Sequence, residues 1–159
     1  AIRALNRKVI EALKIRWGIT HLEVYLTNKG LLFGEIALRP PGGYIMNAIR
    51  HAWGFNPWEA FVAMELDEPF DFPDSPLAYA AVEVLHPGAG TVTAIRGETL
   101  VQSHPSVREF HLKTRPGDHI IRRESVGQDT GYLLHASESP AARLQLHNEL
   151  KQQFAIEVI

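Results

Sequence analysis

The chain has 159 residues, 45% of them apolar, which is enough for one ordinary domain or two small ones with packed cores. A net charge of −2 without a clustered Lys/Arg tract argues against a nucleic-acid partner, and the lack of cysteine excludes disulfides and thiolate zinc sites. No apolar run approaches the ~18 residues that a membrane span requires, and the start of the chain lacks a signal-peptide core. We therefore expect a cytoplasmic protein with no membrane partner.

The first predicted element is a helix from Ile2 to Ile15. Apolar residues recur along one of its stripes, which consists of Ile2, Leu5, Val9, Ile10 and Leu13. No N-cap residue precedes the pattern, and Ala1 is not an initiator methionine. We therefore expect that an upstream half of the protein is missing.

A β-hairpin is predicted next, within HLEVYLTNKGLLFGEIALRPPGG at residues 21 to 43. Asn28, Lys29 and Gly30 suit a three-residue loop. If the loop centres on Lys29, the numbers of opposed residues sum to 58, so that Glu23 faces Glu35. Strand alternation then predicts a core face of Leu22, Val24, Leu26, Leu32, Ile36 and Leu38, and a polar face of His21, Glu23, Tyr25, Phe33, Glu35, Ala37 and Arg39.

The opposed glutamates require an explanation, because like charges with Cβ atoms roughly 5 Å apart destabilise a sheet. One interpretation is a solvated face on which the glutamates point apart and Arg39 neutralises one of them. The other is a bound divalent cation. The run Arg39-Pro40-Pro41-Gly42-Gly43 favours the cation, because the prolines end the strand and the glycines let backbone N–H groups approach a ligand. Two carboxylates, a guanidinium and a glycine-rich helix start suggest a magnesium–phosphate site.

Two helices complete the first predicted domain, residues 1–67. One runs from Tyr44 to Trp53 and is closed by Gly54, and the next begins at Pro57 behind the N-cap Asn56. Residues 68–76 hold three prolines and three acidic residues, which predicts a linker.

The second predicted domain, residues 77–159, is β-rich. Alternating apolar runs between Gly- and Pro-containing turns predict strands at 78–85, 91–95, 107–113, 119–122 and 131–136. A helix is predicted from Ser139-Pro140 to about Gln153, followed by a short strand at 155–158. These elements predict a small antiparallel sheet with one late helix, and the fold class is α+β.

This order of elements resembles the C-terminal half of the ATP-grasp enzymes. The resemblance rests on GITHLEVYLTNKGLLFGEIALRPPGG, on two helices after it, and on PGAGTV, a PGD turn and a final SPAAR helix. It covers nearly the whole chain and is strongest to the carboxylate–amine ligases, such as the L-amino acid ligases. It implies a C-terminal ATP-grasp subdomain followed by a small, lid-like α+β domain.

The resemblance also implies roles for individual residues. Glu23 and Glu35 would hold the Mg²⁺ ions, two of them in this family, that bridge the phosphates of the cosubstrate ATP. Arg39 would be the catalytic residue that contacts the transferred phosphate. Gly42 and Gly43 would line the substrate pocket, and His21 could contact phosphate or substrate. Many ATP-grasp enzymes carry Glu-x-Asn with the asparagine as a further metal ligand, but here Ala37 holds that position.

The function that the resemblance implies is ATP-dependent amide bond formation between a small-molecule carboxylate and an amine, through an acyl phosphate. No Walker-type or GxGxxG loop is present, and the family's nucleotide-binding lysines lie upstream, so we expect the chain to be inactive without its N-terminal half. The sequence does not determine whether the protein forms a homodimer.

Three alternatives remain at this point. The first is an ATP-grasp carboxylase that activates bicarbonate. The second is a non-catalytic binding or assembly module. The third is a metal site formed by His104, His111 and His119, whose spacing matches no compact ligand motif.

Overall fold

The computed structural model describes residues 1–125 and 127–159 and contains two compact units. The first unit comprises residues Ala1–Gly42 and Trp58–Asp71, and the second comprises Gly43–Pro57 and Phe72–Ile159. Both combine helices with antiparallel strands, so the predicted α+β class is confirmed. In the part of the chain that is described, no helix is long and apolar enough to cross a membrane.

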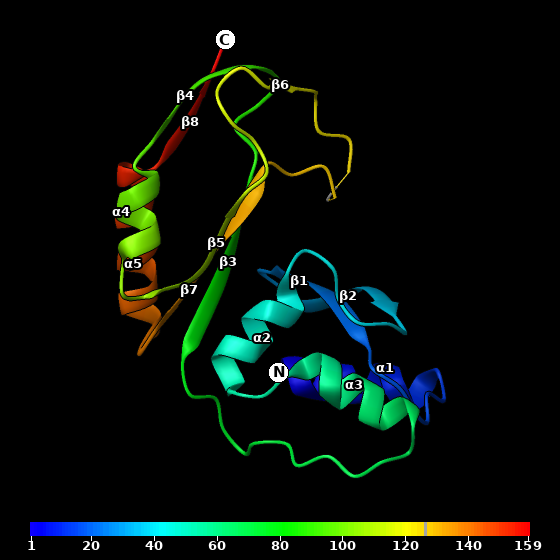
Figure 1. The fold of residues 1–159 in the computed structure, drawn as a ribbon. Helices are drawn as coiled ribbons and strands as arrows, with labels where there is room; N and C mark the ends of the chain where they lie inside the picture. Colours follow the sequence, from blue (N-terminus) through cyan, green and yellow to red (C-terminus); the bar gives the residue numbers. More distant parts are fainter. Residues whose placement is uncertain (126) are drawn as a thin grey trace. The chain divides into compact units, whose positions relative to one another are not determined.

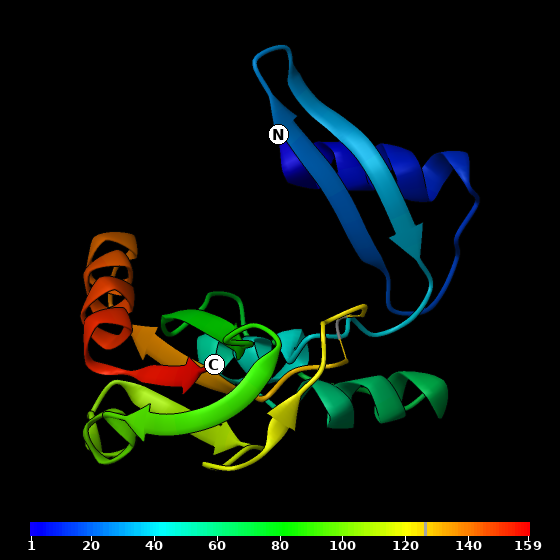
Figure 2. The ribbon, with the colours of Figure 1, turned by 90° about the horizontal axis from the view of Figure 1, so that it is seen from above.

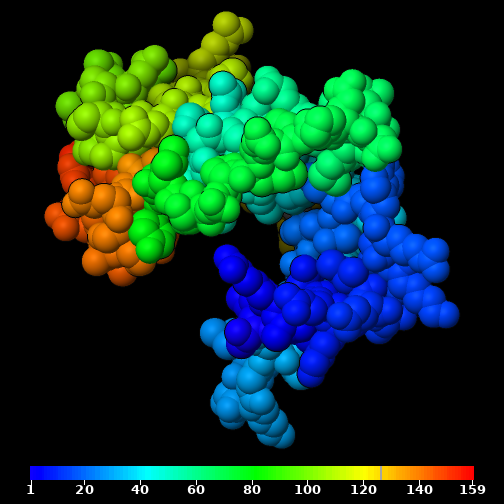
Figure 3. All heavy atoms as spheres, turned by 90° about the horizontal axis from the view of Figure 1, so that it is seen from below, coloured from blue at the N-terminus to red at the C-terminus, as the bar shows by residue number. Residues whose placement is uncertain are grey.

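The first unit contains a helix beside a two-stranded hairpin. Helix α1 (Ile2–Ala12) stops before Lys14, whose φ of 53° is incompatible with continuing the helix. The hairpin pairs β1 (His21–Thr27) with β2 (Gly30–Ala37), and α1 packs against β2. Figures 2 and 3 show that the turn end of the hairpin protrudes beyond α1. Helix α3 (Pro57–Glu65) also belongs to this unit from Trp58 onward.

The register of the hairpin confirms the predicted pairing of Glu23 with Glu35 but differs from the prediction nearer the turn. His21 faces Ala37 and Glu23 faces Glu35, as predicted. The register then shifts at a bulge that leaves Gly34 unpaired, and Thr27 faces Gly30. The loop is therefore Asn28–Lys29, one residue shorter than predicted, and Leu32 lies opposite Tyr25. Leu32 thus belongs to the face of the glutamates and not to the predicted core face.

The second unit contains a three-stranded sheet with helices on both faces. The strand order is β3 (Tyr79–Leu85), β7 (Gly131–Ser137) and β5 (Val107–Leu112), all antiparallel. Neighbouring residues of β7 point to opposite faces. Tyr132 faces α2 (Ile45–Trp53), whereas Leu133 faces α4 (Glu98–Ser103) and α5 (Pro140–Gln153). Figure 1 shows α4 and α5 on one side of this sheet and α2 on the other.

The core of this unit lies on the α4 and α5 face of the sheet. Val101, Leu133, Leu146 and Leu150 are buried against one another there, and Val107, Phe110 and Phe154 pack around them. The predicted start of α5 is confirmed, because the Ser139 side chain accepts a hydrogen bond from the Ala142 amide and Pro140 opens the helix.

Three features of the second unit differ from the prediction. The strands form two sheets and not one, the second having the order β6 (His119–Ile120), β4 (Gly90–Arg96), β8 (Ala155–Val158). Helix α4 was not predicted. Finally, α2 is grouped with the second unit, and the Ala52 carbonyl accepts hydrogen bonds from the Leu77 and Ala78 amides ahead of β3. The domain bounds 1–67 and 77–159 themselves stay a prediction.

Candidate functional site

The two glutamates of the hairpin lie opposite each other on adjacent strands. Glu23 comes from β1 and Glu35 from β2, and both side chains are exposed. The bulge directly precedes Glu35, and a Cβ on Gly34 would lie 3.0 Å from the Glu23 carbonyl oxygen. A bulge re-aims the side chains beside it. Gly34 therefore allows the bulge that sets the direction of the Glu35 side chain.

The predicted residues His21 and Arg39 lie on either side of this pair in the sequence. His21 lies two residues before Glu23, on the same face of β1. Arg39 lies beyond the end of β2, and its guanidinium donates a 3.0 Å hydrogen bond to the Pro40 carbonyl. Among the described residues, no ion pair joins Arg39 to either glutamate. The structure thus places the two glutamates and His21 on one face of the hairpin, whereas Arg39 donates a hydrogen bond to its own neighbour Pro40.

The two glycines fall at the division between the units. Gly42 ends the first unit and Gly43 begins the second. Gly43 has a φ of 62° and Tyr44 a φ of 64°, and α2 starts only at Ile45. Two successive residues in the left-handed region thus precede the helix, which agrees with the predicted glycine-rich helix start.

A polar network that was not predicted holds the first residue after these glycines. The Tyr44 hydroxyl donates to both carboxylate oxygens of Asp129 at 3.2 Å and accepts a 2.8 Å hydrogen bond from Lys113 Nζ. Lys113 also forms a 2.8 Å ion pair with Asp129, whose side chain is 4% exposed. The Tyr44 ring stacks on Tyr132 with centroids 3.9 Å apart. The network therefore fixes the position of Tyr44 and, through it, the backbone that follows Gly43.

Glu109 extends this network to the middle of α2. Its carboxylate accepts hydrogen bonds from Tyr132 Oη at 2.6 Å and Asn47 Nδ2 at 2.9 Å, and it contacts His51 Nε2 at 2.8 Å. Burial opposes the ionisation of Glu109, but these hydrogen bonds outweigh it and lower its pKa. For Tyr132, burial and the Glu109 carboxylate both raise the pKa, to about 12.

We expect the network to make the second unit sensitive to acid. The pKa of Glu109 is lower in the folded protein than its ordinary value of 4.5, so its contribution to stability is complete above pH 4.5 and is lost as pH falls through the folded pKa. Glu109→Gln should lower the free energy of unfolding at neutral pH by about 1–2 kcal/mol and flatten its decline below pH 5. Urea denaturation across pH checks this, with the exposed Glu98→Gln as control. An unchanged acid limb in Glu109→Gln would contradict the assignment.

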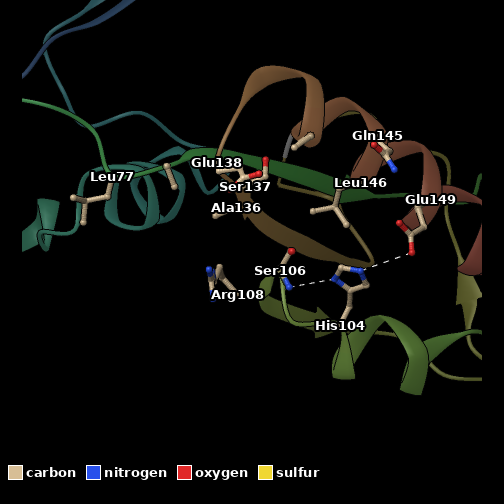
Figure 4. Close-up of a pocket in the computed structure, with 12 residues that line it drawn as sticks. Leu77, His104, Ser106, Arg108, Ala136, Ser137, Glu138, Gln145, Leu146 and Glu149 are labelled. Atoms are coloured by element: carbon tan, nitrogen blue, oxygen red, sulfur yellow. Dashed lines mark hydrogen bonds and ion pairs between the residues drawn. The ribbon is translucent and has the colours of Figure 1, made fainter.

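The second unit also contains a cavity of about 530 Å³ between α5 and the segment joining α4 to β5 (Figure 4). Its lining is mixed, with the polar residues Ser106, Arg108 and Glu149 beside the apolar Leu77 and Leu146. His104 helps to form the wall, where its Nδ1 accepts a 3.2 Å hydrogen bond from the Ser106 amide and its Nε2 lies 3.8 Å from Glu149. Both ring nitrogens of His104 therefore already contact protein groups, Ser106 and Glu149. Within the described residues, no cluster of potential metal ligands includes His104, His111 or His119.

Two comparisons of the sequence with known proteins find similarity to L-amino acid ligases. The model of the L-amino acid ligase C-terminal domain 2 matches residues 83–158. The L-arginine-specific L-amino acid ligase of Bacillus subtilis is 40% identical over 60 residues, which cover 37% of this chain and 14% of that protein.

Solved structures reproduce the fold over nearly the whole chain. The L-amino acid ligase of Bacillus licheniformis superposes with a TM-score of 0.81 at 21% identity, over 98% of this chain and 40% of that one. Phosphoribosylglycinamide synthetase of Anaerococcus prevotii gives 0.76 at 12% identity, over 96% and 40%. N5-carboxyaminoimidazole ribonucleotide synthetase of Thermotoga maritima gives 0.70 at 20% identity, over 99% and 42%. The chain thus spans about 40% of the length of these proteins. Residues 83–158 therefore match the C-terminal domain 2 of L-amino acid ligases, and the fold of the chain is that of the corresponding part of these solved ligases and synthetases.

Proposed function

We propose that the protein containing this chain is an ATP-dependent carboxylate–amine ligase that joins an amino acid to an amine. The observation that carries the proposal is the direct opposition of Glu23 and Glu35 across the hairpin, together with the family match of residues 83–158. The chain spans only part of its relatives, so the reaction belongs to the whole protein, and we propose that the chain alone is inactive.

Mg²⁺ fits the residues that are present. It prefers oxygen ligands and usually retains water and substrate phosphates beside one or two carboxylates. Glu23 and Glu35 supply these carboxylates, and both are exposed and therefore accessible to a phosphate-bound ion. Ala37 offers no side-chain oxygen, so water and phosphate oxygens would complete the shell. When bound, Mg²⁺ supplies neutralisation of phosphate charge.

The other predicted residues would act on the substrates directly. Arg39 would donate from its guanidinium to the oxygens of the transferred phosphoryl group, which a planar fork matches well. His21 would contact phosphate or substrate from the same strand face as Glu23. The amides of Gly42 and Gly43 would donate to the carboxylate substrate, which their lack of a side chain allows at close range.

The proposed reaction has two balanced steps. A substrate carboxylate oxygen attacks the γ-phosphorus of ATP, the bond to the β-phosphate oxygen breaks, and ADP leaves with an acyl phosphate formed. The amine then attacks the acyl carbon, the carbon–oxygen bond to phosphate breaks, and inorganic phosphate leaves as the amine loses a proton. Positioning and charge stabilisation are the protein's main contributions to such chemistry.

Phosphate release by the full-length protein tests this function. With Mg²⁺ and ATP, we expect release that depends on an amino acid and increases with a second amino acid or amine, and the amide product should appear by mass spectrometry. Bicarbonate replaces the amino acids in a parallel reaction. Release that responds to bicarbonate and to no amino acid would contradict the ligase and support a carboxylase. No ATP-dependent release under any condition would support a binding module.

A further inference from the structure

Three potential metal ligands converge in the second unit, away from the hairpin. Glu83 lies on β3, His135 on β7 and His147 on α5. His147 Nδ1 lies 2.6 Å from Glu83 Oε1, and His135 Nε2 lies 3.3 Å from the same oxygen. One ligand atom from each residue lies within 4.8 Å of those of the other two. The sheet register explains the convergence, because Glu83 and His135 sit on the face that α5 covers.

His135 is the unusual member of this cluster. Its side chain is 0% exposed, and neither ring nitrogen has a hydrogen-bond partner among the described residues. The Nε2 is close enough to Glu83 for an ion pair but lacks the geometry of a hydrogen bond. A buried polar atom without a partner destabilises the folded protein, and most such atoms in native proteins are satisfied. A ligand that bonds to Nε2 would remove this cost.

The donor set is that of a transition-metal ion. Imidazole nitrogen and carboxylate oxygen bind Zn²⁺ at about 2.0–2.2 Å, so that ligand atoms of a tetrahedral site lie about 3.4 Å apart. The distance from His135 Nε2 to Glu83 Oε1 already has this value within 0.1 Å, at 3.3 Å. His147, 32% exposed, is closer to Glu83 and has room to move outward. Glu83 also borders a cavity of about 340 Å³, although neither histidine lines it.

We propose that Glu83, His135 and His147 bind a divalent transition-metal ion, with Zn²⁺ the best match, and with water in the fourth position. The ion ties α5 to β3 and β7 and thereby stabilises the second unit. This site does not depend on the ligase reaction, because its ligands lie in the second unit and the predicted Mg²⁺ ligands Glu23 and Glu35 lie in the first.

Zn²⁺ binding to the purified, chelator-stripped protein tests the proposal. At neutral pH, competition with a chromogenic chelator should give one Zn²⁺ per chain with an apparent Kd of about 1 μM or lower. The midpoint of thermal unfolding should rise by about 5 °C when Zn²⁺ is in excess. His147→Ala and Glu83→Gln should each weaken binding about 100-fold or more, whereas His147→Cys, which supplies a thiolate, should retain it within about tenfold.

Two controls separate this site from the others. His119→Gln, at an exposed histidine outside the cluster, should bind Zn²⁺ as the parent protein does. Glu23→Gln should also bind Zn²⁺ normally even if it abolishes ligase activity, so that failure of one proposal is distinct from failure of the other. The absence of stoichiometric Zn²⁺ binding, or binding that His147→Ala and Glu83→Gln leave unchanged, would overturn the metal site. The cluster would then be a hydrogen-bonded contact between α5 and the sheet.

Discussion

Glu35→Gln should reduce the amino-acid-dependent phosphate release proposed for the full-length protein at least about 100-fold. The substitution keeps the shape of the side chain but removes the negative charge. A neutral amide oxygen is a poor replacement for a carboxylate at a hard cation with few protein ligands. Since Glu23 and Glu35 are the only two such ligands predicted here, the loss of either leaves one carboxylate. Glu23→Gln should therefore have an effect of similar size.

The dependence on Mg²⁺ distinguishes a ligand from a residue that is merely nearby. If the glutamates hold the ion, the Mg²⁺ concentration for half-maximal phosphate release should increase in both variants. Glu65→Gln, an exposed glutamate at the end of α3, is the matched control and should retain the parent rate. Parent-like rates and Mg²⁺ dependence in Glu23→Gln and Glu35→Gln would reject the metal assignment. The solvated-face interpretation of the hairpin would then account for the pair.

The same two substitutions should not lower the free energy of unfolding, in contrast to their effect on activity. Two opposed carboxylates repel each other in the absence of a cation, and exposed pairs of this kind alter stability by a few tenths of a kcal/mol. Glu35→Gln should therefore leave the free energy of unfolding unchanged or slightly increased when Mg²⁺ is removed. A loss of activity without a loss of stability is the pattern expected of a functional residue.

The opposed glutamates could be predicted because the hairpin is a local structure. Its register depends on the loop and on alternation, both of which are visible within about twenty residues of sequence. The details nearer the turn were wrong, since the loop has two residues and a bulge at Gly34 restores the predicted pairing at Glu35. A glycine inside a strand pattern often marks a bulge. Gly34 was therefore a signal in the sequence that could have located the shift.

The second unit shows the limit of such reasoning. Its individual strands and its late helix were predicted from local alternation and capping, but their division into two sheets was not. In the structure β3 pairs with β7 and β4 pairs with β8, and each pairing joins segments about fifty or more residues apart in the chain. Nothing in a single sequence specifies which of several similar strands become neighbours.

The polar network around Tyr44 escaped prediction for the same reason. Tyr44, Glu109 and Asp129 come from three distant segments and are unremarkable in their own local sequence. In the sequence, His104, His111 and His119 stood out as possible metal ligands because they recur in one stretch. The structure instead places His135 and His147 beside Glu83, which combines a strand, a helix and a second strand. Proximity in the chain was a poor guide to proximity in the fold.

Gly131→Ala should destabilise the second unit by about 3–5 kcal/mol. Gly131 opens β7 and lies between Leu85 of β3 and Leu112 of β5, with a φ of 139° that L side chains rarely adopt. A Cβ there would overlap the carbonyl oxygen of His111, a backbone atom that cannot move without disturbing the sheet. The substitution therefore combines backbone strain with a steric clash in the central strand of the unit.

Gly117→Ala separates these two effects. Gly117 also has a positive φ, of 98°, but a Cβ there would meet no atom within 4 Å. This variant should cost only about 1–2 kcal/mol, the penalty for an L residue in that conformation. Urea denaturation followed by circular dichroism should therefore place Gly131→Ala at least about 2 kcal/mol below Gly117→Ala. Equal stabilities would mean that the sheet adjusts around position 131 and that the close approach of β5 to β7 at this point is not a constraint on the fold.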